Sequence, residues 1–171
     1  MMDNNPNAKR SMIAAALACG IAAPCEGLRQ YVYKDPVGIP TYCFGETKNP
    51  IPGKHYTTEE CKALLNDHML QAVDQVERCA PDAPISVLGA FGSAVYNLGP
   101  RLACDPAHST AARLLSEGKW PEACEQLPKW NKATAPGGVL ITLPGLTKRR
   151  LMERDACLKF DDSPQHEVPN A

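Results

Sequence analysis

Apolar side chains recur at helical spacing over much of the chain, and two stretches show this most clearly. Between Cys61 and Val76 they return every three or four positions, which predicts a long amphipathic helix. Thr57 precedes this helix and Glu60 follows three residues later, which is the pattern of a capping box. Residues 86–98 are apolar around most of a helical circumference, which predicts a buried helix.

The remaining segments divide into helices, turns and polar ends. Further helices are expected at 11–30, with a break or a fresh start near Pro24, and at 108–117, 121–130 and 147–159, whereas 132–146 is expected to be a Gly/Pro-bearing loop. Residues 31–56 combine turn formers with β-branched residues, which predicts a small β-rich lobe. Residues 1–10 and the tail from Asp161 are polar and expected to be disordered. The fold class is therefore α+β and predominantly helical, with a small β-hairpin lobe joined to a helical lobe by a long helix.

Length and charge limit the possible functions. The chain has 171 residues, 44% of them hydrophobic, which suits one domain or one domain in two lobes. Its formal net charge is −1, and no basic block is present that would neutralise phosphates. This composition argues against nucleic acid as a partner.

Eight cysteines are many for a cytosolic chain of this size. They stand at positions 19, 25, 43, 61, 79, 104, 124 and 157. An even count with wide spacing predicts disulfides and an oxidising compartment. No Cys-x-x-Cys pair occurs and the histidines do not cluster with the cysteines, so we expect neither a metal nor another cofactor.

The N-terminus has the features of an export signal. Lys9 and Arg10 precede an Ala/Gly-rich apolar run at 11–23. The run is shorter than the ~20 residues that a stable membrane span needs, and it fits the apolar region of a secretory signal. Cleavage of this signal, retention of an uncleaved anchor and a plain core helix of a cytosolic protein are all open from these residues.

Two carboxylates and a hydroxyl lie close in sequence but in different local settings. Glu26 is followed by apolar Leu28, Asp35 opens a turn, and Thr41 lies on a short extended segment. Partial desolvation is expected to help Glu26 keep a proton, whereas an exposed Asp35 should stay ionised. Glycoside hydrolysis needs one carboxylic acid for the leaving oxygen and one carboxylate for water or the sugar cation.

The residues around these groups resemble the catalytic segment of phage-type lysozymes, the endolysin family of muramidases. The similar motifs, in order, are 26–29 (Glu-Gly-Leu-Arg), 33–38 (Tyr-Lys-Asp-Pro-Val-Gly), 41–47 (Thr-x-Cys-x-Gly-Glu-Thr), 56–66, 94–99 and 145–150 (Gly-Leu-Thr-Lys-Arg-Arg). The resemblance covers about residues 25–160. It implies a lysozyme-like fold with a cleft between two lobes, peptidoglycan as the substrate and a monomeric enzyme.

The resemblance also implies roles for single residues. Glu26 would be the general acid, Asp35 and Thr41 would hold the attacking water, and the reaction would invert the anomeric centre. Thr47, Tyr96 and Asn97 are candidates for substrate contact, although Tyr96 is equally compatible with a core aromatic whose hydroxyl is bonded. Glu46 replaces a histidine that is common in the family, and we expect it to be solvated or at the cleft rim rather than catalytic.

Related sequences often carry both Cys124 and Cys157, and both Cys43 and Cys61, which implies these two pairs. Cys79 would then pair with Cys104, and Cys19 and Cys25 are left in the N-terminal region. Trp130 is expected to be a core residue rather than a sugar platform.

Some phage endolysins carry a weakly apolar signal-arrest-release segment, which holds the enzyme inactive in the host inner membrane and later escapes into the periplasm. Glu26 follows the apolar run almost directly, which favours an uncleaved segment of this kind. We therefore expect a signal-anchor at 1–24, a catalytic domain at 25–160 and a disordered tail at 161–171. The same reading implies export by the host machinery and cooperation with a phage holin or pinholin.

Two other functions stay open from the residues alone. A transglycosylase on the same scaffold should lack the aspartate that handles water, and Asp35 is present. A secreted, disulfide-rich glycan-binding or inhibitor module would need no catalytic pair.

Overall fold

The structure is a computed structural model that describes residues 6–36 and 38–159. Its elements are α1 (Pro6–Glu26), β1 (Arg29–Lys34), β2 (Pro40–Cys43), α2 (Thr58–Cys79), α3 (Ile85–Leu98), α4 (Arg101–Cys104), α5 (Thr110–Ser116), α6 (Trp120–Cys124), the 3-10 helix η1 (Leu127–Lys129), β3 (Lys132–Thr134), β4 (Leu140–Thr142) and α7 (Pro144–Cys157). The predicted tail at 161–171 and the first five residues lie outside the described part.

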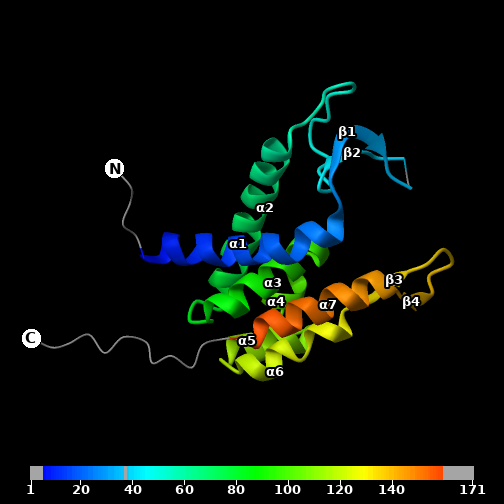
Figure 1. Cartoon of the computed structure of the whole chain (residues 1–171). Coiled ribbons are helices and arrows are strands. Elements are labelled where there is room, and N and C mark those ends of the chain that lie inside the picture. Colours follow the sequence, from blue (N-terminus) through cyan, green and yellow to red (C-terminus); the bar gives the residue numbers. More distant parts are fainter. Residues whose placement is uncertain (1–5, 37, 160–171) are drawn as a thin grey trace, which may run out of the picture.

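Two lobes make up the described molecule, and α2 joins them (Figure 1). The small lobe holds the antiparallel pair β1–β2, in which Tyr33 lies opposite Thr41. The larger lobe is helical, with α3 lying among α1, α2 and α7. The predicted α+β, predominantly helical fold with a long connecting helix is confirmed.

The buried helix α3 forms the centre of the core, as its apolar circumference predicts. Val87, Leu88, Phe91 and Ala94 have no exposed surface. Neighbouring helices approach α3 closely at a glycine: a Cβ on Gly92 would lie 2.6 Å from Cγ2 of Val73 in α2. Small residues on α3 therefore set how close the surrounding helices can come.

The long helix α2 begins as its capping box predicts. The Thr57 side chain accepts from the Glu60 backbone N–H, and the Glu60 side chain accepts from the Thr57 backbone N–H at 2.7 Å. These two bonds satisfy amide groups that a helix start leaves without partners.

The first helix differs from the prediction. Instead of spanning 11–30 with a break, α1 runs from Pro6 to Glu26 with Pro24 inside it, and residues 6–10, expected to be disordered, are helical. Pro24 lies in the last turn, so the backbone hydrogen bond that its missing N–H cannot make is one of the last of the helix. Arg10 explains the earlier start, since its guanidinium donates to the Ala83 carbonyl and lies 3.8 Å from the Glu77 carboxylate.

The C-terminal third also differs in detail. The segment 132–146 is not a loop, because β3 and β4 pair as a hairpin and α7 already begins at Pro144. The predicted helix 121–130 is two short elements, α6 and η1, and the second contains Pro128. Proline cannot donate a backbone hydrogen bond, which prevents one continuous helix here.

Three disulfides join the elements: Cys43–Cys61, Cys79–Cys104 and Cys124–Cys157. All three expected pairs are confirmed. Cys19 and Cys25 on α1 are free thiols.

Among the described residues, no helix combines the length and the apolar character that crossing a membrane requires.

Candidate active site

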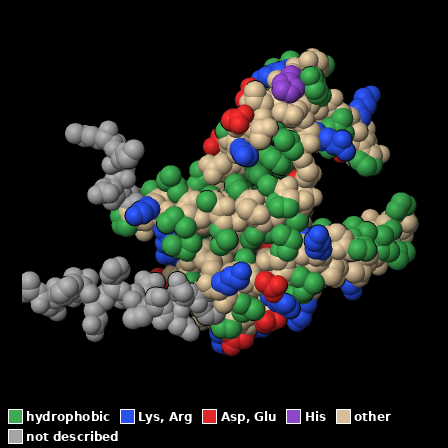
Figure 2. All heavy atoms as spheres, viewed as in Figure 1, with side chains coloured by type: hydrophobic (Ala, Val, Ile, Leu, Met, Phe, Trp, Pro, Cys, Tyr) green, Lys and Arg blue, Asp and Glu red, His purple; other side chains and the backbone are tan. Residues whose placement is uncertain are grey.

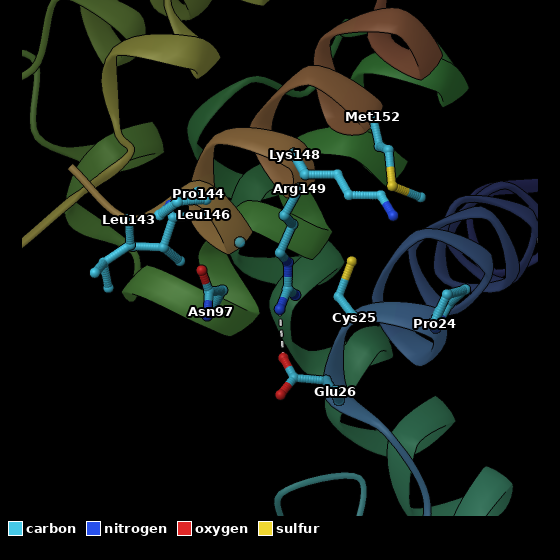
Figure 3. Close-up of a pocket in the computed structure, with 11 residues that line it drawn as sticks. Pro24, Cys25, Glu26, Asn97, Leu143, Pro144, Leu146, Lys148, Arg149 and Met152 are labelled. Carbon is cyan, nitrogen blue, oxygen red and sulfur yellow. Dashed lines mark hydrogen bonds and ion pairs between the residues drawn. The ribbon is translucent and has the colours of Figure 1, made fainter.

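Glu26 ends α1 and faces a cavity of about 670 Å³ between α1, α3 and the start of α7. Its lining includes Cys25, Asn97 from α3 and the segment 143–146 at the start of α7 (Figure 3). The Glu26 side chain is 24% exposed. A partly covered carboxyl group at the rim of a cavity of this size can meet a sugar-sized ligand.

Arg149 holds the Glu26 carboxylate from the opposite wall (Figure 3). Its Nη1 donates to Oε1 of Glu26. The other oxygen, Oε2, points toward the small lobe, since a Cβ on Gly45 would lie 3.6 Å from it. The ion pair thus fixes the carboxyl group between the two lobes.

Arg149 is itself fixed by a buried group of polar side chains. Its Nε donates to Oε1 of Glu153 at 3.2 Å, and its Nη2 donates to the Ser93 carbonyl at 3.2 Å. Ser93 Oγ also donates to Glu153 at 2.7 Å. Because Arg149 is only 4% exposed and Glu153 is fully buried, this guanidinium has little freedom to move away from Glu26.

Arg150 completes the buried group, with its Nε 2.6 Å from Oε2 of Glu153. Burial lowers the pKa of Arg150 and raises that of Glu153, while their mutual attraction opposes both shifts. The resemblance to phage lysozymes contained the signal for this group, since the motif 145–150 ends in two arginines. Sequence reasoning nevertheless assigned neither arginine, nor Glu153, to the site.

Asp35 and Thr41 lie on the small lobe, Asp35 at the turn that joins β1 to β2 and Thr41 on β2 next to that turn. Oδ1 of Asp35 accepts from the Ile39 backbone N–H at 2.8 Å, and the Asp35 backbone N–H donates to the Ile39 carbonyl. Thr41 is buried, and its hydroxyl donates to the Ile39 carbonyl at 2.9 Å. The turn therefore holds both side chains in one small unit, but neither lines the cavity of Glu26.

The other predicted substrate contacts lie in three different places in the structure. Asn97 lines the Glu26 cavity, and its Oδ1 is buried without a hydrogen-bond partner among the described residues. Thr47 is exposed on the small lobe. Tyr96 packs against the core and donates its hydroxyl to the Phe44 carbonyl at 3.1 Å, which matches the second of its two alternatives. Burial and the nearby Glu26 charge raise the pKa of Tyr96 to about 12.

Glu46 is not solvated, which was one of the two alternatives expected for it. Its side chain is only 7% exposed, and Oε1 accepts from the backbone N–H groups of Thr47 and Lys48. Oε2 lies 3.1 Å from Nε2 of His68 on α2. Because the Glu46 carboxylate accepts hydrogen bonds from two backbone N–H groups, it stabilises the turn after β2 and is buried there.

Trp130 packs against the core as expected, and it also borders a second hollow with Lys132 and Leu140. No cluster of three or more His, Cys, Asp or Glu residues suited to a metal ion occurs in the described ranges 6–36 and 38–159.

A small β lobe and a helical lobe joined by a long helix, with an acidic side chain fixed between them, define the lysozyme-like class of glycoside hydrolases. The family model described as phage lysozyme matches residues 23–153. The chain belongs to the phage lysozyme family, whose members are glycoside hydrolases that act as muramidases in host lysis.

Curated relatives cover most of the chain. The SAR-endolysin of Bacteriophage PS119 is 42% identical over 135 residues, which are 78% of this chain and 76% of the relative. The SAR-endolysins of Bacteriophage PS34 and Enterobacteria phage P21 are each 36% identical, over 92% and 90% of this chain and 98% and 97% of their own length.

Solved structures agree with the fold. The active form of the P1 phage endolysin Lyz superposes with a TM-score of 0.70 at 26% identity and covers 83% of both chains. The endolysin of Escherichia coli O157:H7 phage FAHEc1 gives a TM-score of 0.72 at 27% identity over 86% of this chain and 91% of its own.

Proposed function

We propose that the chain is a signal-arrest-release endolysin that hydrolyses the β-1,4 bond between N-acetylmuramic acid and N-acetylglucosamine in peptidoglycan, with Glu26 as the general acid. The observation that carries this assignment is the position of Glu26, held by Arg149 at the rim of a sugar-sized cavity that α1, α3 and the start of α7 line. A general acid must be positioned before it can protonate a leaving oxygen, and the ion pair supplies that positioning.

Asp35 is the proposed base that orients the attacking water, and Thr41 is the proposed second contact to that water. The turn that holds Asp35 also holds Thr41, because both bond to Ile39. The Thr41 hydroxyl donates to a carbonyl, so its oxygen lone pairs are left to accept from water. The proposed acid ends α1 and the proposed base lies at the β1–β2 turn. Inversion requires room for a water between two such groups.

Asn97 is the proposed sugar contact on the helical lobe. Asn97 lines the cavity, and its Oδ1 is buried and lacks a protein partner within the described part of the chain. The N–H of an N-acetyl group is a suitable donor, because it would satisfy a buried acceptor that otherwise lacks a bond. Thr47 is proposed to contact the glycan from the small lobe.

Analysis of the digestion products tests the reaction type. Purified sacculi digested by the enzyme should yield free reducing ends, and proton NMR during the first minutes should show the inverted anomer. Products that end in 1,6-anhydromuramic acid would instead identify a transglycosylase, which forms this ring without water. Binding of sacculi without any new ends would identify a glycan-binding module.

The proposed tether uses residues that belong to α1 in the folded enzyme. Ala14, Ala18 and Ala22 have no exposed surface, and α1 packs against α3. The same residues cannot lie in lipid and in this core at once. A tethered enzyme would therefore lack its first helix and the fixed position of Glu26, which supports an inactive membrane form and an active periplasmic form, released in cooperation with a phage holin or pinholin.

The tether is tested with leucines at two exposed positions of α1, Ala16 and Gly20. Ala16→Leu/Gly20→Leu should raise the apolar character of the segment without disturbing the core. We expect this variant to accumulate in the inner membrane and to delay lysis, whereas Ala16→Ser/Gly20→Ser should release normally. N-terminal sequencing of the periplasmic wild-type protein provides the second measurement, and a start after residue 20 or 23 would show ordinary signal cleavage instead.

A further inference from the structure

The β3–β4 hairpin extends from the helical lobe as a separate arm (Figure 1). Three consecutive residues in it are largely exposed: Val139 at 61%, Leu140 at 64% and Ile141 at 41%. Figure 2 shows hydrophobic side chains covering the end of this arm, with basic side chains near its base. Single exposed aliphatic residues are common on protein surfaces, but a continuous run of them marks an interaction site.

The sequence of the arm has no charge along its length. Residues 133–147 contain neither an acidic nor a basic side chain, whereas Lys132 and Lys148 stand at the two ends. Exposed hairpins usually carry charged residues that keep them soluble and unpaired. The absence of charged residues from 133–147 indicates a surface that binds apolar groups of a ligand. The lysines at its base indicate that the ligand also carries negative charge.

The arm is continuous with the cavity of Glu26. Leu143, Pro144 and Leu146 follow β4 directly and line that cavity together with Glu26 (Figure 3). A polymer bound at Glu26 is much longer than the cavity, so part of it must leave across the surrounding surface. Because the arm begins at the cavity wall, it is one of the surfaces that the polymer can cross.

We propose that the β3–β4 hairpin is a glycan-binding arm, on which Val139, Leu140 and Ile141 contact the peptidoglycan strand beyond the cavity. The inference rests on the proposed function, because it takes peptidoglycan as the substrate. The strand carries an N-acetyl methyl group on each sugar and a lactyl methyl group on alternate sugars, which match an aliphatic surface. Its stem peptides carry carboxylates, which match Lys132 and Lys148 at the base of the arm.

A lipid surface fits the arm less well. Segments that lie in a membrane interface typically carry Trp or Phe together with many basic residues, and the arm at 133–147 contains no aromatic side chain. The other alternative is that a second copy of the chain binds the arm. The oligomeric state of the protein would show this directly.

The test replaces the three exposed residues with threonine, which preserves the β-strand preference of the segment. The triple variant Val139→Thr/Leu140→Thr/Ile141→Thr is compared with Ile51→Thr, which removes an aliphatic side chain of similar exposure (54%) from the small lobe. Each protein is assayed on intact sacculi and on a purified murein tetrasaccharide, which offers far fewer sugars beyond the cavity than a sacculus strand does.

For the triple variant we expect KM on sacculi to rise about tenfold, while kcat/KM on the tetrasaccharide changes by less than about twofold. Ile51→Thr should match the wild type on both substrates. An unchanged KM on sacculi for the triple variant would overturn the glycan-binding arm.

Two further measurements separate the other occupants. Wild-type protein that sediments with phosphatidylglycerol vesicles, and no longer does so as the triple variant, would overturn the proposal in favour of lipid. A wild-type dimer in sedimentation velocity that the triple variant converts to monomer would overturn it in favour of a second copy. If the wild type cleaves neither substrate, the proposed function fails, and co-sedimentation of wild-type and triple variant with sacculi still tests the arm.

Discussion

Arg149 donates from Nη1 to Oε1 of Glu26, and so joins the start of α7 to the end of α1 across 123 positions of sequence. The contact brings a nearly buried guanidinium to a partly exposed carboxylate. Because Arg149 is also bonded to Glu153 and Ser93, the proposed acid is positioned by the core of the helical lobe.

Arg149→Ala should lower both activity and stability. Its loss frees the Glu26 carboxyl group and leaves the buried Glu153 with fewer partners, and breaking a buried ion pair typically costs about 3–5 kcal/mol. Murein turnover and chemical denaturation measure the two effects. Arg154→Ala, which removes a more exposed arginine from the same helix, is the control and should leave both activity and stability nearly unchanged. Equal effects of the two substitutions would show that Arg149 has no special role.

Gly89→Ala should weaken the docking of α1 on α3. A Cβ at this position would lie 2.7 Å from Cδ2 of Leu17 and 2.9 Å from the Ala14 carbonyl oxygen, so the two helices must move apart. Overpacking of this kind typically costs about 1–3 kcal/mol. Since Glu26 ends α1, we expect murein turnover to fall together with the melting temperature.

Gly20→Ala is the matched control for this prediction, because it adds the same methyl group to α1 where no atom lies within 4 Å. Alanine is the better helix former by about 1 kcal/mol, so this variant should be as stable as the wild type or more so. A loss of stability there equal to that of Gly89→Ala would refute the steric explanation.

Cys124→Ser should lower the free energy of unfolding by about 2–5 kcal/mol, because it removes the disulfide to Cys157 between α6 and α7. Cys25→Ser removes a free, exposed thiol and should leave stability nearly unchanged. Mass mapping of the non-reduced protein checks the pairing itself. Free thiols at both Cys124 and Cys157 would rule out the disulfide.

We expect deprotonation of the Tyr96 hydroxyl to lower the stability of the enzyme at alkaline pH. Its pKa is raised from the ordinary 10.0 to about 12 by burial and by the Glu26 charge. The folded protein therefore holds this proton more tightly than the unfolded chain, so the stabilisation is complete below pH 10 and is lost as the pH rises toward 12. Denaturation curves across this range should fall more steeply for the wild type than for Tyr96→Phe, and parallel curves would contradict the assignment.

Much of the fold could be predicted from the sequence where local signals and burial agree. The capping box at Thr57 set the start of α2, and the apolar circumference of 86–98 identified α3. The three disulfides followed from the family resemblance, since six cysteines alone allow many pairings.

Other features depend on contacts that no local pattern reveals. The start of α1 at Pro6 depends on Arg10 meeting Ala83 and Glu77, far away in sequence. Glu46 turned inward because His68 on α2 lies beside it, in addition to the backbone amides of its neighbours Thr47 and Lys48. The β3–β4 hairpin was missed because its strands are short and its apolar residues are exposed, so they show no alternation between a buried and a solvated face.

The central claim is that Glu26 supplies the proton that cleaves the glycan, and one measurement tests it most directly. The rate at which purified Glu26→Gln releases reducing ends from murein should be lower than that of the wild type by a factor of about 10² to 10⁴, because glutamine keeps the shape and loses the proton. Circular dichroism and melting temperature should show that the variant is folded. A folded Glu26→Gln enzyme that cleaves murein at close to the wild-type rate would contradict the account.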